Sequence, residues 1–126
     1  MYVIKHTDAP ITSMSGIRHT TLAGSGQGLR QLSVWQQSVQ PGGATPPHRH
    51  DCEEVVLCTG GQGELRIDNR ETHGFGPGST VIIPRNVLHQ IASVGTEDLQ
   101  FVAIFSTTPV EAYFPDGGFI ELPWAS

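Results

Sequence analysis

The stretch that decides the fold of this chain is His48-Arg49-His50-Asp51-Cys52-Glu53-Glu54, and His89 follows it 35 positions later. In an extended segment His48 and His50 project from the same face, because the side chains of a strand alternate with a period of two. Both imidazoles can therefore reach one ion at the ~2.0–2.1 Å of a metal–nitrogen bond. Two histidines and a carboxylate are typical of non-haem metal sites. We favour a metal site over the alternative of two surface histidines in a Pro-rich loop.

The residues around this stretch extend the pattern in both directions. Five residues separate Gly42 from His48, and three separate His50 from Glu54. Six more residues separate Glu54 from Gly61. The histidine pair and the carboxylate thus lie between two glycines, which favour tight turns.

A second set of residues lies about 30 positions further along the chain. Five residues separate Gly78 from Pro84, and His89 follows Pro84 at the fifth position. Together the two sets resemble the two sequence motifs of the cupin superfamily. Asn86 stands where that family usually has Gly, and Ser93 where it usually has Asn. Asn tolerates left-handed backbone better than most residues, so Asn86 can serve the same turn.

The cupin resemblance covers about residues 31–106 and carries a fold and a ligand set. It implies an all-β protein, a double-stranded β-helix or jelly-roll barrel, with the ligands in its mouth. It also implies that His48, His50, Glu54 and His89 bind one divalent metal ion. The Irving–Williams order leaves iron, manganese, nickel, zinc and copper all open as the native metal.

Two neighbours of the ligands compete for a role in the site. Glu54 lies an even number of positions after His50, so both side chains face the same side if the segment stays extended. Glu53 lies an odd number of positions after His50 and would face outward. The motif spacing also supports Glu54. We interpret Cys52 as structural or incidental, because a reactive thiol needs surroundings that lower its pKa. Whether Cys52 or Glu53 joins the site stays open at this point.

Turn residues and apolar alternation divide the chain into short strands. The expected strands are residues 32–39, 54–59, 64–68, 71–75, 79–83, 87–94 and 99–105. Residues 60–63, which include three glycines, are expected to form a hairpin turn. The chain reads as a single domain with three parts. These are an N-terminal arm (1–30) contributing strands or dimer contacts, a barrel core (31–106), and a C-terminal tail (107–126) packed on the barrel or a partner.

Composition and charge exclude several classes of function. Twelve acidic residues against seven basic ones give a net charge of −5, and no basic cluster marks a nucleic-acid interface. The longest apolar run is five residues, 101–105, far too short to span a membrane. Residues 1–30 hold no apolar stretch resembling a signal peptide, so we expect a cytoplasmic protein.

Apolar residues on both faces of single strands predict a homodimer. On one expected strand Val55 and Leu57 oppose Val56 and Cys58. A closed barrel has one interior, so the outer face needs cover from the arm, the tail or a second subunit. Three aromatic residues are expected in the core, where some can line a cavity: Trp35, Phe101 and Phe105. Three further histidines are expected at the surface or in hydrogen bonds: His6, His19 and His73.

Four protein ligands leave two positions of a six-coordinate ion open, which suits chemistry better than a closed structural site. We predict a metal-dependent enzyme for a small organic oxyacid or enolisable carbonyl compound, with dioxygenase-type cleavage as the leading reaction. In this hypothesis Glu54 holds the metal and can act as a general base. Arg85 either orients an anionic group of the substrate or is a solvated loop arginine. The alternatives are an O2-independent isomerase or lyase of the uronate-processing cupin type, and a non-catalytic cupin that binds a ligand or metal.

Overall fold

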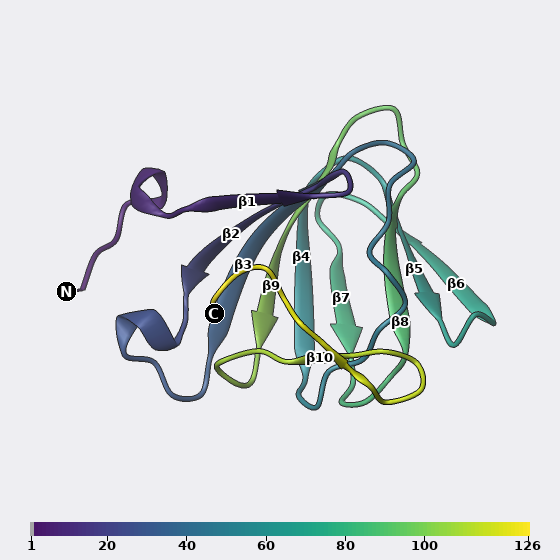
Figure 1. The fold of residues 1–126 in the computed structure, drawn as a ribbon. Helices are drawn as coiled ribbons and strands as arrows, with labels where there is room; N and C mark the ends of the chain where they lie inside the picture. Colours follow the sequence, from purple (N-terminus) through teal and green to yellow (C-terminus); the bar gives the residue numbers. More distant parts are fainter. Residues whose placement is uncertain (1) are drawn as a thin grey trace.

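A computed structural model describes residues 2–126 and shows two facing β-sheets (Figure 1). The strands are β1 (Ile11–Met14), β2 (Ile17–Ala23), β3 (Ser33–Val39), β4 (Glu54–Gly60), β5 (Gly63–Ile67), β6 (Glu71–Phe75), β7 (Thr80–Ile83), β8 (His89–Ser93), β9 (Leu99–Phe105), β10 (Ala112–Tyr113) and β11 (Phe119–Ile120). The helical elements of the described residues are two single 3-10 turns, η1 (His6–Asp8) and η2 (Ser25–Gln27). The prediction of an all-β, jelly-roll fold is confirmed.

The larger sheet has the strand order β1-β2-β3-β9-β4-β7, and all of its neighbouring strands are antiparallel. The smaller sheet has the order β6-β5-β8, and β10 pairs with β11 at the end of the chain. Figure 1 shows β5, β6 and β8 on the side of β7 that lies away from β1. The two sheets enclose the interior that holds the candidate site.

Residues 43–49 connect the smaller sheet to the tail without being a regular strand. The Thr45 amide donates to the Ile91 carbonyl of β8 at 2.9 Å. Arg49 and Tyr113 of β10 exchange a pair of backbone hydrogen bonds at 3.0 and 2.9 Å. Pro46 and Pro47 interrupt the ladder in between, because proline has no N–H to donate. The segment therefore lies between β8 and β10 and brings the histidine pair to the barrel mouth.

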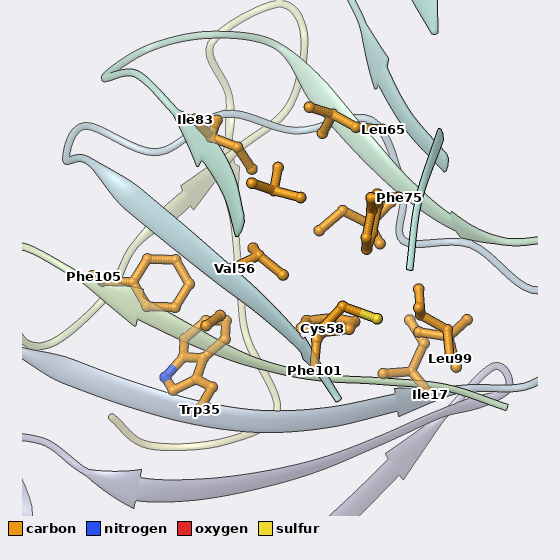
Figure 2. Packing of buried hydrophobic residues seen from close by; sticks show 14 of the residues in the cluster. Ile17, Trp35, Val56, Cys58, Leu65, Phe75, Ile83, Leu99, Phe101 and Phe105 are labelled. Atoms are coloured by element: carbon orange, nitrogen blue, oxygen red, sulfur yellow. The ribbon is translucent and has the colours of Figure 1, made fainter. Parts of the chain in front are cut away.

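Apolar side chains from both sheets meet in one core (Figure 2). Burial alternates along β3, β4 and β9, so every second side chain points inward. Trp35, Phe101 and Phe105 are 4%, 1% and 1% exposed, which confirms the prediction that they belong to the core. Burying each such ring stabilises the fold by about 1.5–3 kcal/mol. Cys58 is also buried in this cluster.

Most strand boundaries agree with the sequence prediction to within a residue or two, but the hairpin expected at residues 60–63 is wrong. β4 pairs with β7 and β9, whereas β5 pairs with β6 and β8. Gly61 has a φ of +76°, and a Cβ there would lie 2.3 Å from the Asp98 carbonyl oxygen. The glycine-rich turn therefore connects β4 of the larger sheet to β5 of the smaller sheet. On the way the chain passes close to Asp98, in the loop before β9.

The strand expected at 87–94 begins later, at His89. Pro84 and Val87 are joined by a backbone hydrogen bond of 3.3 Å, which closes a turn before the strand. Within that turn Asn86 has a φ of +64°, in the left-handed region that the sequence assigned to it.

Parts of segments 2–30 and 107–126 pack against the barrel. β1 and β2 extend the larger sheet, because β2 pairs with β3 along its whole length apart from a bulge near Ala23. In the tail, Leu122 and Trp124 are half-buried against the core. Among residues 2–126, no helix has both the length and the apolar character needed to cross a membrane.

Candidate metal centre

Two of the predicted ligands are paired directly through their backbones. His48 in segment 43–49 and His89 at the start of β8 form an antiparallel bridge. Each amide donates to the other's carbonyl, at 3.0 and 2.9 Å. Their rings lie 4.3 Å apart between centroids. The fold therefore brings together two histidines that lie far apart in the sequence.

The other two predicted ligands, His50 and Glu54, lie in contact with each other and close to His89. Glu54 is the first residue of β4, and both side chains are buried. The Glu54 Oε1 atom lies 3.6 Å from Nε2 of His50 and 3.4 Å from Nε2 of His89. Glu53 is exposed, and its amide donates to the Ser106 hydroxyl, so it lies outside this cluster.

Each histidine is oriented by a hydrogen bond of its other ring nitrogen. The Nδ1 atoms of His48, His50 and His89 lie 2.6, 2.6 and 2.9 Å from the backbone carbonyls of three residues. These acceptors are Pro46, Glu111 and Val87. A carbonyl can only accept, so each Nδ1 carries the proton and each Nε2 keeps a free lone pair. This is the tautomer that a metal ligand needs.

The charges of the cluster favour a bound cation. Burial is the main cause that lowers the pKa of His48 to about 3 and lowers that of His50. Burial alone would raise the pKa of Glu54, but its contact with the histidines, above all His89, holds that pKa below the usual value. For His89 burial acts downward, and the neighbouring Glu54 carboxylate outweighs it and raises the pKa. The site thus holds a buried carboxylate among imidazoles, where a cation would take the place of a proton.

The side chains fit a divalent metal ion. The potential ligand atoms of His48, His50 and His89 all lie within 4.8 Å of one another. Two nitrogens bound to one ion can be at most about 4.2 Å apart, so only a small contraction is needed. Nε2 of His89 and Oε1 of Glu54 are buried without a hydrogen-bond partner, and such atoms call for a ligand. All four predicted ligands are therefore brought together, Glu54 through its contacts to His50 and His89.

An apolar cavity of about 80 Å³ lies beside two of these histidines. His48 and His50 line it together with Trp35 and Gln37 of β3 and with residues of the tail. The tail residues in this wall are Ile120, Glu121, Leu122, Pro123 and Trp124. A small molecule in this cavity would contact two of the residues that can hold a metal, His48 and His50.

Sequence reasoning missed Gln37 and Trp124 as residues of the site. Gln37 shares its parity with Trp35, and a buried polar residue on an inward strand face was a usable signal. Trp124 had no such signal, because the path of the tail over the barrel is a tertiary property. Arg85, a predicted catalytic residue, is exposed and does not line the cavity. Cys52 is 1% exposed, and burial is the main cause that raises the pKa of its thiol to about 11.

Comparison with known proteins identifies the family. The family model described as auxin binding protein matches residues 4–123. Auxin-binding protein 1 of Arabidopsis thaliana is 39% identical over an alignment of 116 positions, which covers 83% of this chain. The chain spans 58% of the length of that relative.

Solved structures support the same fold. The polyketide cyclase RemF of Streptomyces resistomycificus superposes with a TM-score of 0.73 at 25% identity, over 90% of this chain and 86% of its own. A sugar phosphate isomerase of the cupin superfamily from Silicibacter pomeroyi gives a TM-score of 0.68 at 26% identity, over 83% of this chain and 74% of its own. With a family model that matches 120 of its residues and a cupin barrel around three histidines and a glutamate, this chain belongs to the auxin-binding protein family.

Proposed function

We propose that this chain binds a divalent metal ion through His48, His50, Glu54 and His89 and, beside the metal, a small aromatic carboxylic acid of the auxin kind. One observation carries the proposal: two of these histidines also line the apolar cavity. The name of the Arabidopsis relative supports the choice of ligand. The metal would supply a positive charge and open positions that a carboxylate can occupy.

The residues of the cavity suit the remainder of such a ligand. Trp35 and Trp124 offer ring faces for an aromatic group, and Gln37 adds a polar amide. Most small-molecule pockets have volumes of about 300–1000 Å³, so a cavity of 80 Å³ has to widen when a bicyclic acid enters. We expect the widening at residues 121–126 of the tail, which lie outside the strands and are held by individual hydrogen bonds such as those from Thr21 and Ser25.

Calorimetry with indole-3-acetate tests this proposal. The protein is freed of metal, reloaded separately with Fe(II), Mn(II), Ni(II), Zn(II) or Cu(II), and titrated with the acid. Indole-3-ethanol serves as the matched ligand, because it keeps the ring and lacks the carboxylate. We expect binding that requires both the metal and the carboxylate. Equal binding without metal, or no binding with any of the five metals, would overturn the proposal.

A matched pair of variants assigns the binding to the histidine cluster. His48→Ala removes a residue that lines the cavity and belongs to the metal cluster. His73→Ala removes an exposed histidine of β6 that belongs to neither. Indole-3-acetate should lose at least about tenfold in affinity with the first variant and none with the second. Similar losses in both would mean that the acid binds elsewhere.

An enzyme is the second candidate, and Glu54 favours it. Its Oε1 atom is buried without a hydrogen-bond partner, so the carboxylate is free to accept a proton from a group that reaches it. The cyclase and isomerase neighbours support catalysis on this fold, while the dioxygenase reaction stays a prediction from the sequence. The test follows O2 uptake and product formation with diketones, catechols, uronates and oxalate for each metal. Oxygen consumption with Fe(II) and one substrate class would establish the dioxygenase, and turnover without O2 an isomerase or lyase.

A further inference from the structure

A second cavity, of about 460 Å³, lies between the N-terminal arm and the tail. His19 and Thr21 of β2 line it on one side. It shares two lining residues, Pro123 and Trp124, with the 80 Å³ cavity at the metal centre. These two tail residues therefore form a wall between a roomy outer cavity and a small inner one.

A chain of hydrogen bonds runs from the inner cavity to the tail. Gln37 lines the inner cavity and is the cross-strand partner of His19. Its amide nitrogen donates to Nδ1 of His19 at 3.0 Å. Nε2 of His19 lies 2.7 Å from the Thr21 hydroxyl, which itself donates to the Ala125 carbonyl at 2.7 Å.

The directions of these bonds agree with one another. The single proton of the Thr21 hydroxyl goes to the Ala125 carbonyl, so Thr21 must accept from His19. Nε2 of a neutral His19 then carries its one proton, and Nδ1 is left to accept from Gln37. One tautomer thus satisfies every group, and His19 is only 1% exposed.

His19 also touches the shared wall directly. Its ring is stacked on Trp124, with centroids 3.8 Å apart and planes at 10°. Trp35 meets the same imidazole edge-on at 4.9 Å, and its ring also lies edge-on to Trp124 at 5.2 Å. The position of the Trp124 indole is therefore set by His19 through both the ring stack and the bond from Thr21 to the next residue.

We infer that His19 is a positioning residue that holds Trp124 as a movable wall between the two cavities. When the wall opens, the outer cavity joins the inner one and a bicyclic aromatic acid can reach the metal centre. When it closes, the indole covers the acid. The part of this inference that concerns the acid rests on the proposed function, while the part that concerns Trp124 does not.

The pair Thr21→Val and Thr20→Val tests the inference without any ligand. Both make the same change on β2, but only Thr21 bonds to His19 and Ala125. Fluorine NMR of protein labelled with 5-fluorotryptophan resolves Trp35 and Trp124, the only two tryptophans. We expect Thr21→Val to shift and broaden the Trp124 signal and Thr20→Val to leave it as in the native protein. His19→Phe, which keeps a ring and removes both hydrogen bonds, should resemble Thr21→Val.

Surface plasmon resonance with indole-3-acetate and the metal-loaded full chain gives the second readout. Thr21→Val should raise both the association and the dissociation rate at least about fivefold and leave metal content unchanged. An unchanged Trp124 signal and unchanged rates in both Thr21→Val and His19→Phe would overturn the role of His19. A native protein that binds no indole-3-acetate would overturn the proposed function instead, and the fluorine signals would still decide on His19.

Discussion

At the scale of single residues, two features bring the four predicted metal ligands together. These are the local spacing of three of them and the long-range backbone bridge between His48 and His89. His48 and His50 could be chosen from the sequence because their spacing of two places them on one face. Glu54 is favoured by the motif spacing, although a bend at residues 51–52 interrupts the extended segment. His89 could be chosen only through the cupin resemblance, since no local rule brings it to His48. Trp124 depends on how the tail crosses the barrel, which no residue pattern encodes, whereas Gln37 could have been found from its inward position on β3.

The first prediction concerns metal content. The double variant His48→Ala with His50→Ala should bind divalent metal more than about 100-fold more weakly, because loss of even an outer partner of a ligand costs 10–100-fold. Mass spectrometry of metals in protein reloaded with Zn(II) measures the effect. The control is His6→Ala with His73→Ala, two exposed histidines outside the cluster. Equal zinc content in the two double variants would contradict the assignment.

The second prediction concerns pH and His19. Burial lowers its pKa from the ordinary 6.5 to about 4, so the folded protein favours the neutral ring and the unfolded chain takes up a proton first. The free energy of unfolding should therefore fall as the pH drops from 6.5 to 4, by up to ~3 kcal/mol from this residue. Urea unfolding of native and His19→Phe protein across this range isolates the effect. The variant should show the smaller decrease; identical slopes would contradict it.

At the scale of elements, strand positions follow from the sequence far better than strand partners do. The strands β6 and β9 begin and end where alternation and turn residues predict. The pairing of β4 with β9 and β7 does not follow from the sequence. The Gly-rich turn at 60–63 is compatible both with a hairpin and with a connection between two sheets. A turn signal specifies local backbone, whereas the partner of a strand is chosen by distant residues.

A glycine pair tests that passage between sheets. Gly61 and Gly78 both have positive φ, but a Cβ at Gly61 would meet the backbone of Asp98, and one at Gly78 meets nothing within 4 Å. Gly78→Ala should cost about 1–2 kcal/mol of unfolding free energy from strain alone. Gly61→Ala should cost at least ~3 kcal/mol, because the backbone must also shift. Urea denaturation of both variants gives the comparison, and equal losses would contradict the close approach.

At the scale of the whole molecule, the outer face of the larger sheet carries a row of apolar residues. The register places Ile82, Val55, Ile104 and Val34 side by side across β7, β4, β9 and β3. Ile82 is 71% exposed, which leaves apolar surface for a partner. The homodimer expected from the sequence stays a prediction, as does the cytoplasmic location.

Light scattering at micromolar concentration tests the dimer. We expect the mass of two chains for the native protein and of one chain for Ile82→Glu, because the charge would be buried between like subunits. Thr80→Glu makes a similar change at an exposed residue of the same strand and lies outside the apolar row. A native protein with the mass of one chain would refute the homodimer and leave the packed tail unaffected.

The backbone bridge between His48 and His89 has a consequence for sample preparation. Because two ligand residues are tied by their own amides, and the rings are oriented by carbonyls, the pocket is preorganised before any ion arrives. Ions can then exchange without unfolding of the surrounding strands. The ion recovered from a purified sample will reflect the growth medium and the Irving–Williams series as much as selection by the protein. Cells grown with one transition metal at a time would reveal which ion the pocket retains.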